Sequence, residues 1–295
     1  MEKSLKGRKN LQFYSTQDIG DPEITSVTEA LRSNVLSRGP KVEEFEAKIG
    51  AVCKGSKALA VNSATSALHL AYILADVNVS SLVWTSPITF VATANTAMQL
   101  GAKIDFVDIN PETLNICPEM LEDKLREAKQ VGKMPHIVTA VHFAGNPCDM
   151  DPIHTLSKKY GFKVIEDASH AFGASYNGVP IGGDKRSLAS IFSFHPVKMI
   201  TTGEGGALIV GSEEIWQKVN IIRSHGVDSA SNVRNKKDTC PWYYEQTEIG
   251  YNYRMTEMQA AMGTVQIARL PNFVDKRNKL ANLYKKKLAN LPIKF

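Results

Sequence analysis

The lysine most able to do chemistry follows one of the apolar runs of the sequence. Lys198 comes just after the run 188–194 and shortly before a glycine cluster at 203–206. Lysine usually lies on polar faces, so its place between an apolar run and glycines is unusual. Burial there would lower its pKa toward the neutral amine, the form that condenses with an aldehyde. A lysine that caps a loop is the alternative interpretation.

A carboxylate and a histidine follow a second apolar run, 162–165. Asp167 would lose hydration at the end of a buried strand unless a cation or a hydrogen-bond donor compensates it. It is therefore expected either to cap a helix or to face a protonated ring nitrogen. His170 lies near the same face if a helical turn begins here. A purely structural role is the alternative for this histidine.

Small hydroxyl residues follow a third apolar run, 58–61. The stretch 62–68 reads NSATSAL. Such residues at a strand-to-helix turn leave backbone N–H groups and hydroxyls free at a helix N-terminus, which is a favourable place for a phosphate. A simple Ser/Thr helix cap fits this stretch equally well.

The three features together favour one cofactor. Ligands of open α/β sheets bind at the carboxyl ends of the strands, where these residues would meet. A phosphate cradle, a carboxylate for a pyridine nitrogen and an amine for an aldehyde are the contacts that pyridoxal 5'-phosphate requires. The sequence has no HExxH metal motif, no GxSxG elbow and no P-loop that would favour another chemistry.

The elements that must position these residues follow from the hydrophobic pattern. Short apolar runs without strict alternation are typical of strands covered on both faces, and helical stretches lie between them. This alternation predicts an α/β fold with a mostly parallel, seven-stranded sheet. The expected strands are 58–61, 82–84, 104–107, 136–141, 162–165, 188–194 and 207–210.

Capping residues predict where the helices begin. Asp21-Pro22 should start a helix over 24–31, and Asp151-Pro152 a helix over 153–160 that Gly161 ends. Two further starts are expected at Ser212, before 213–223, and at a Thr256/Gln259 capping box, before 258–270. A separate helix should follow Pro271, and 291–295 resembles the entry into a strand. The polar stretch 228–239 is predicted to be a loop.

Composition excludes several classes of protein. The chain has 295 residues, 43% of them hydrophobic and 22% charged, as in ordinary soluble globular proteins. It has neither a membrane-length apolar segment nor a secretory signal at its start, so a cytoplasmic location is expected. Its four scattered cysteines favour neither a zinc site nor a disulfide framework. The basic stretch 276–287 is interpreted as a solvated helix face, because a nucleic-acid surface would be denser in charge.

Several motifs, in this order, carry a family resemblance. They are NSATSAL, SPITFVATAN, EDASHAFGA, SFHPVK, TTGEGG, RSHG and GYNYRMTEMQAAMG. From about Phe13 onward the chain resembles the DegT/DnrJ/EryC1/StrS sugar-nucleotide aminotransferases. The resemblance implies the aspartate-aminotransferase-like fold (fold type I) and pyridoxal phosphate as cofactor.

The resemblance also implies roles for individual residues. Lys198 matches the lysine that bonds the cofactor aldehyde and then moves the proton between substrate and cofactor. Asp167 matches the partner of the pyridine nitrogen, and His170 the Gln/His position beside the ring. Further matches are Thr65, Ser66 and Ser193 for phosphate binding, Phe90 for ring stacking, Asn252 for the phosphate of the neighbouring subunit, and, weakly, Tyr14 for the sugar.

The implied reaction moves an amino group from L-glutamate to a keto-sugar nucleotide. The motif wording is most similar to family members of pseudaminic acid synthesis, which implies a UDP-linked 4-keto-6-deoxy-N-acetylhexosamine aminated at C4. Asn252 implies a homodimer with shared sites, and the positive charge of +5 suits an anionic substrate. Alternatives are a dTDP- or GDP-linked keto-sugar, a sugar dehydratase, in which histidine would replace Lys198, and a catalytically silent relative with a regulatory role.

The resemblance divides the chain into three parts. Residues 1–20 would form an N-terminal arm, 21–270 the cofactor-binding large domain, and 271–295 the start of a truncated C-terminal small domain. Family members usually continue further, so lower stability or activity is expected of this chain than of one that carries a family C-terminal domain.

Overall fold

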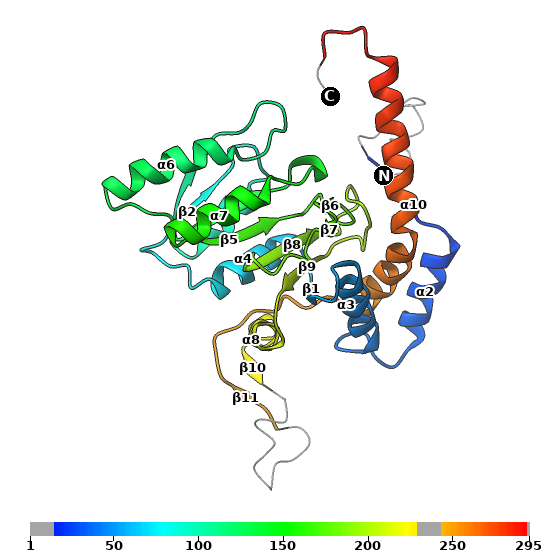
Figure 1. Cartoon of the computed structure of the whole chain (residues 1–295). Coiled ribbons are helices and arrows are strands. Elements are labelled where there is room, and N and C mark those ends of the chain that lie inside the picture. Colours follow the sequence, from blue (N-terminus) through cyan, green and yellow to red (C-terminus); the bar gives the residue numbers. More distant parts are fainter. Residues whose placement is uncertain (1–14, 229–242, 294–295) are drawn as a thin grey trace, which may run out of the picture.

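A large sheet forms the centre of the molecule (Figure 1). The computed structural model describes residues 15–228 and 243–293. Within these residues it shows one seven-stranded sheet in the order β1-β9-β8-β5-β4-β2-β3. Its strands are β1 (Lys57–Val61), β2 (Leu82–Thr85), β3 (Lys103–Phe106), β4 (Ile137–Val141), β5 (Lys163–Asp167), β8 (Ala189–Ser193) and β9 (Gly206–Val210).

The sheet is mostly parallel, as the sequence predicts. Strands β3, β2, β4, β5 and β8 pair in parallel, whereas β9 is antiparallel to both β8 and β1. Each of the seven predicted runs coincides with one of these strands, and no strand end differs by more than two residues. The predicted fold class is confirmed.

Helices cover both faces of the sheet (Figure 1). None of the helices in the described part of the chain is long and apolar enough to cross a membrane. The helices are α2 (Asp21–Arg32), α3 (Pro40–Val52), α4 (Ala64–Leu74), α5 (Ala92–Gln99), α6 (Pro118–Gln130), α7 (Met150–Tyr160), α8 (Glu213–Arg223), α10 (Glu257–Lys287) and the 3-10 turn η1 (Phe143–Gly145). Two small hairpins, β6 (Ser175–Tyr176) with β7 (Val179–Pro180) and β10 (Val227–Asp228) with β11 (Glu245–Gln246), lie outside the sheet.

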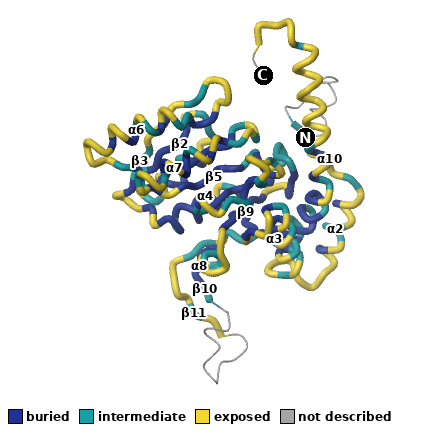
Figure 2. Tube along the Cα trace, in the orientation of Figure 1, coloured by how far each residue is buried: buried dark blue, intermediate teal, exposed yellow. Residues whose placement is uncertain are grey.

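The core lies on the two faces of the sheet, and the buried strands run through its middle (Figure 2). On one face Ile165 and Ile191 pack with Tyr72 of α4. On the other face Phe192 packs with Phe45 of α3, and a neighbouring cluster joins Val164 to α6 and α7. Burial on both sides explains why the strands read as apolar runs rather than as alternating patterns.

Three of the predicted caps are confirmed. The Ser212 hydroxyl accepts a hydrogen bond from the N–H of Ile215 at the start of α8. Thr256 and Gln259 form the predicted capping box at the start of α10. Gly161 ends α7 in the left-handed conformation, with φ of 81°.

The starts of α2 and α7 differ from the prediction. The cap of α2 is Gly20, not Asp21, because the Glu23 carboxylate accepts the N–H of Gly20 at 2.9 Å and so fixes the turn one residue earlier. In α7 the cap is Asp149, and Asp151 lies inside the first turn. An acidic residue is favourable anywhere in the first turn, so the sequence signal does not fix the cap to one residue.

Helix α10 continues through Pro271, so the predicted separate helix after this proline is wrong. Its 31 residues run from Glu257 to Lys287 without a break. A proline removes one backbone donor, but Leu270 and Phe273 on either side are buried in the core and hold the helix together. The predicted domain boundary at residue 270 falls inside this helix, and the division into domains stays a prediction.

From the end of α10 to Ile293 the described residues form turns, and the strand expected over 291–295 is not seen up to that residue. Residues 294–295 lie outside the described part. The predicted loop 228–239 also lies outside it, except for Asp228, which belongs to β10.

Side chains satisfy backbone groups along the free edge of β1. The Glu46 carboxylate accepts the N–H of Ala60 at 2.8 Å. Arg223 donates to the carbonyl of Ala60 at 2.7 Å, and the Trp216 indole donates to the carbonyl of Ala58 at 2.8 Å.

Side chains also bond backbone groups along the free edge of β3. The Asp105 carboxylate accepts the N–H of Phe106 at 2.8 Å, and the Lys124 ammonium donates to the Phe106 carbonyl. At both ends of the sheet, side chains therefore occupy backbone groups that a further strand would need.

Candidate active site

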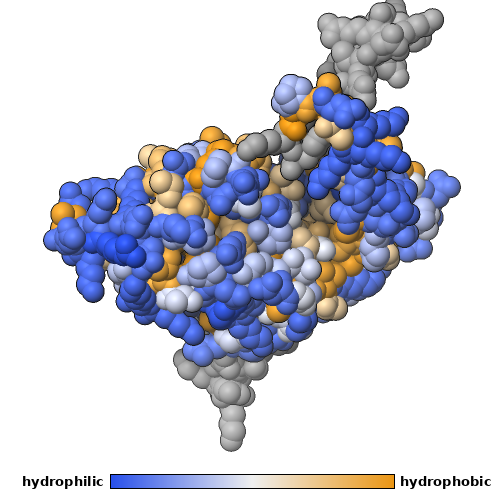
Figure 3. Space-filling model, turned by 45° about the horizontal axis from the view of Figure 1, so that its top comes forward, coloured by the Kyte–Doolittle hydropathy of each residue, from blue (hydrophilic) through white to orange (hydrophobic). Residues whose placement is uncertain are grey.

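A cavity of about 420 Å³ opens at the carboxyl ends of the central strands. This volume is within the roughly 300–1,000 Å³ typical of sites for small molecules. The face of the molecule in Figure 3 is largely hydrophilic, with smaller hydrophobic areas between. The cavity brings together six residues that the sequence singles out, which are Thr65, Phe90, Asp167, His170, Ser193 and Lys198.

The N-terminus of α4 forms one wall of the cavity. Ser63 caps this helix by accepting the N–H of Ser66 at 3.1 Å, and Ala64 and Thr65 line the cavity beside it. The free N–H groups and the positive end of the helix dipole face an anion favourably here. Gly206 of β9 lies so close that a Cβ atom at this residue would be 2.5 Å from the Ala64 nitrogen. A glycine is therefore required at Gly206.

Thr65 and Ser66 have different surroundings. Thr65 is exposed at the cavity. Ser66 is buried behind it, and its hydroxyl donates to the side chain of Asn62 at 2.6 Å. The structure thus places Thr65 but not Ser66 on the lining where a phosphate would lie.

Asp167 ends β5 at the base of the cavity, and both of its carboxylate oxygens accept hydrogen bonds. Ser169 donates to Oδ1 from its backbone N–H at 3.2 Å and from its hydroxyl at 2.6 Å. The hydroxyl of Thr93 donates to Oδ2 at 2.7 Å. The carboxylate therefore resembles a turn cap on one side and is fixed from the protein core on the other. Only 5% of the residue's surface is exposed.

Lys198 and His170 lie near this carboxylate and influence each other. Burial lowers the pKa of Lys198, and the nearby charge of Asp167 partly opposes this effect. Burial also lowers the pKa of His170, with a further decrease from Lys198 and an opposing increase from Asp167. The cavity therefore lowers the pKa of both the amine and the imidazole beside one buried carboxylate.

Phe90 and Ser193 also line the cavity. Phe90 precedes α5, and 72% of its surface is exposed, which leaves its ring free to stack on a flat ligand. Ser193 ends β8, and its hydroxyl accepts the N–H of His195 at 3.5 Å.

One further predicted site residue, Asn252, does not reach the cavity of its own chain. Asn252 is exposed and does not line the cavity, and its backbone carbonyl accepts a hydrogen bond from the side chain of Asn62. Tyr14 lies outside the described residues. The structure of one chain therefore does not bring Asn252 to its own cavity.

Sequence reasoning missed several residues of the site. Thr89 and Ser169 line the cavity, and Thr93 lies directly behind it. The hydroxyls of Thr89 and Thr93 lie 2.7 Å apart. Thr89 lies in the bend before α5 and Thr93 in the first turn of that helix, so their contact depends on the path of this bend, which the sequence pattern does not give.

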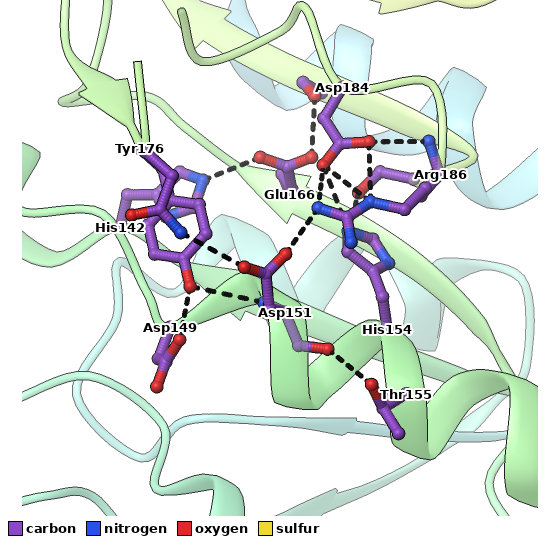
Figure 4. A network of polar contacts seen from close by, with 12 residues as sticks. His142, Asp149, Asp151, His154, Thr155, Glu166, Tyr176, Asp184 and Arg186 are labelled. Carbon is purple, nitrogen blue, oxygen red and sulfur yellow. Dashed lines mark hydrogen bonds and ion pairs between the residues drawn. The ribbon is translucent and has the colours of Figure 1, made fainter. Parts of the chain in front are cut away.

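A polar network supports β5 from the opposite face of the sheet (Figure 4). Glu166, which neighbours Asp167 in the strand, is buried and lies 2.8 Å from Nε2 of buried His142. Arg186 bridges Asp184 and Asp151 at the surface of the same network. This arrangement holds the strand that carries Asp167.

The residues fit the cofactor that the sequence predicts. A helix N-terminus with free N–H groups suits a phosphate, Asp167 suits a pyridine nitrogen and Lys198 suits an aldehyde. The close approach of Gly206 to α4 keeps the phosphate end of the cavity compact. Among the described residues no cluster of histidine, cysteine and carboxylate side chains could hold a metal ion.

Comparison with known proteins finds similar transaminases. A UDP-4-amino-4,6-dideoxy-N-acetyl-β-L-altrosamine transaminase of Campylobacter jejuni is 41% identical over 280 residues, which is 95% of this chain and 70% of the relative. Helicobacter pylori PseC, an aminotransferase involved in the biosynthesis of pseudoaminic acid, has a similar structure with a TM-score of 0.84 and 32% identity, over 95% of this chain and 71% of that one.

A third relative bears on the cofactor. The sugar aminotransferase Spr1654 from Streptococcus pneumoniae, in its PLP-form, matches with a TM-score of 0.83 and 27% identity, over 95% of this chain and 72% of that one. The model of the DegT/DnrJ/EryC1/StrS aminotransferase family matches residues 17–295. With its fold, its cavity and these relatives, the chain belongs to the DegT/DnrJ/EryC1/StrS family of sugar aminotransferases, which implies the use of pyridoxal phosphate.

Proposed function

We propose that the chain transfers the amino group of L-glutamate to C4 of a UDP-linked 4-keto-6-deoxy-N-acetylhexosamine, with 2-oxoglutarate as the second product. The observation that carries this proposal is the cavity in which Lys198, Asp167 and the N-terminus of α4 meet. The 41% identity to the Campylobacter transaminase supports the choice of sugar and nucleotide. The reaction would belong to pseudaminic acid biosynthesis in the cytoplasm.

The residues of the cavity have complementary tasks in this proposal. When bound, pyridoxal phosphate supplies the aldehyde and the electron-accepting ring. Lys198 provides the amine that holds this aldehyde and then moves a proton at the reacting carbon, for which its lowered pKa is suited. Asp167 would hold the ring nitrogen, Phe90 would stack on the ring, and Thr65 with Ser193 would bind the phosphate. His170 would contact the ring.

A homodimer is part of the proposal. Asn252 is exposed and lies away from the cavity of its own chain. We infer that it reaches the phosphate site of a neighbouring subunit, so that two chains share two sites. The sugar nucleotide would contribute affinity far from the reacting carbon and so help to orient it.

Absorption spectroscopy and mass spectrometry test the assignment. Pyridoxal phosphate added to the purified protein should give a visible band that L-glutamate bleaches, and borohydride should fix a pyridoxyl group on Lys198. Lys198→Ala should lose both signals, whereas Lys54→Ala, at an exposed residue, should keep them. A protein that forms no adduct on Lys198 would be a silent relative instead.

The choice of substrate requires a separate measurement. After the glutamate step, each candidate keto-sugar nucleotide is added, and the return of the visible band is followed. We expect the UDP-linked sugar to restore it fastest. Faster recovery with a dTDP- or GDP-linked sugar would reassign the substrate and leave the aminotransferase assignment intact.

A further inference from the structure

Two threonines connect the cavity wall to the buried carboxylate. Thr89 lines the cavity, and Thr93 lies behind it in the first turn of α5 with no exposed surface. The two hydroxyl oxygens are 2.7 Å apart. The hydroxyl of Thr93 is also 2.7 Å from Oδ2 of Asp167.

The direction of these hydrogen bonds follows from their chemistry. An ionised carboxylate can only accept, and a threonine hydroxyl has a single hydrogen. Thr93 must therefore donate to Asp167, so that Thr89 must donate to Thr93. Each donation polarises the next, which strengthens the bond that reaches the carboxylate.

Thr93 is also fixed through its backbone. The hydroxyl of Tyr72 donates to the carbonyl of Thr93 at 2.9 Å and lies 2.8 Å from the hydroxyl of Thr139. Because the hydrogen of Tyr72 is used on the carbonyl, Thr139 must donate to Tyr72. Burial raises the pKa of Tyr72, so the phenol remains a donor at neutral pH. Tyr72, Thr93 and Thr139 are all fully buried.

A fully buried polar network of this kind needs a reason, because the same space could hold apolar side chains. In the described part of the chain, the only charged group that this network contacts through hydrogen bonds is the carboxylate of Asp167. The other oxygen of that carboxylate is held by Ser169. Each carboxylate oxygen has two acceptor positions, so Oδ2 can accept a ring N–H in addition to the hydroxyl.

We propose that Thr93 is a positioning residue that fixes the carboxylate of Asp167 to meet the ring nitrogen of the cofactor, and that Thr89 completes this chain of donors from the cavity side. The inference rests on the proposed function, in which Asp167 binds that nitrogen. Thr93 itself does not line the cavity and acts through Asp167. Tyr72 and Thr139 hold Thr93 in place.

The test compares two buried threonines of α5. Thr93→Val removes the hydroxyl and keeps the branched shape, and Thr93→Ser restores the donor. Thr96→Val is the matched control, because Thr96 is equally buried but bonds only the carbonyl of Ala92 on its own helix. The readouts are the dissociation constant of pyridoxal phosphate and the pH midpoint of the bound cofactor's absorption band.

We expect Thr93→Val to bind the cofactor about tenfold more weakly, which is the scale of one hydrogen bond to a charged group. We also expect the pH midpoint of the bound cofactor's absorption band to move to lower pH. Thr93→Ser should restore both values, and Thr96→Val should leave both unchanged. Thr89→Val, at the cavity wall, should give a smaller change in the same direction, and it serves as the test if Thr93→Val does not fold.

Two outcomes would overturn the inference, and they can be told apart. Normal cofactor binding by the unaltered chain, with Thr93→Val and Thr89→Val indistinguishable from Thr96→Val, would refute the role of Thr93 alone. An unaltered chain that binds no pyridoxal phosphate would refute both this inference and the proposed function.

Discussion

At the scale of single residues, the pKa of the Lys198 amine depends on its burial and on one carboxylate. Burial lowers the pKa of Lys198, while the charge of Asp167 opposes the decrease. A neutral amine is the reactive form, so this balance sets the pH at which the lysine can react. The same carboxylate keeps the pKa of His170 from falling further.

The reaction of Lys198 with a small acylating reagent should therefore depend on pH in a defined way. Because its pKa is lowered, the half-maximal rate should come below pH ~10.4, the usual lysine value. In Asp167→Asn the opposing charge is lost, so the midpoint should move to still lower pH. Peptide mass spectrometry of the protein without cofactor measures the rate, with exposed lysines of the same chain as references. A midpoint that rises in Asp167→Asn would contradict this account of the electrostatics.

The sequence identifies the residues of this site that follow strands. It misses residues that lie behind the cavity wall and contact the lining residues. Lys198 and Asp167 come directly after apolar runs, where the carboxyl ends of strands meet. Ser66 has the right residue type, but its hydroxyl turns to Asn62, because a helix start has several hydroxyls and only some face the ligand. The role of Thr93 depends on a contact across 74 residues of sequence, which no local pattern encodes.

At the scale of elements, the contact between β9 and α4 determines the shape of the phosphate end of the cavity. Strand β9 runs antiparallel to its neighbours and brings Gly206 against the first turn of α4. A Cβ atom at Gly206 would meet backbone atoms of both Ser63 and Ala64 within 2.8 Å. Backbone cannot move aside as a flexible side chain can.

Gly206→Ala should therefore displace the start of α4. We expect a loss of about 1–3 kcal/mol in the free energy of unfolding, the usual cost of overpacking, together with weaker phosphate binding. Gly211→Ala, just after β9, is the matched control, because its Cβ would meet side-chain carbons no closer than 3.6 Å. Urea unfolding and inorganic phosphate titration measure the two effects. Equal results for the two variants would show that α4 can move without cost.

The limits of the sequence are clearest at element boundaries. The strands were predictable because burial on both faces gives continuous apolar runs. The start of α2 was not predictable, because the contact of Glu23 with Gly20 fixes it. The passage of α10 through Pro271 was not predictable either, because it depends on the burial of Phe273. Helix propensity describes neither contact.

At the scale of the whole molecule, the sheet separates the face with the cavity from a supporting face. Asp167 belongs to the first, and its neighbour Glu166 to the second, where His142 and Ser190 contact the Glu166 carboxylate (Figure 4). Burial would raise the pKa of Glu166, but the hydrogen bond and charge of His142 outweigh it and lower the pKa.

Removal of Glu166 should therefore destabilise the whole fold. Glu166→Ala leaves a buried imidazole without its partner, and we expect a loss of about 3–5 kcal/mol. Glu166→Gln should lose less, because its amide oxygen can still accept a hydrogen bond. The pKa of Glu166 is lower in the folded chain than its ordinary value of 4.5, so the ionised carboxylate stabilises the fold above that pH. Below pH 4.5 this stabilisation decreases. The difference in free energy of unfolding between the unaltered chain and Glu166→Gln should therefore shrink there. Urea unfolding across pH 3–7 measures this difference, and a constant advantage would argue against the ion pair.

The capped borders of the sheet limit how copies of this chain can associate. Before a strand of another chain could pair with either edge, side-chain hydrogen bonds to the backbone would have to break. On β1 these are the bonds of Glu46, Trp216 and Arg223, and on β3 those of Asp105 and Lys124. Polymerisation through continuous hydrogen-bonded ribbons, the usual route to fibres, is thereby disfavoured. In the proposed homodimer, the two subunits would therefore meet through loops and helices rather than through the edges of their sheets.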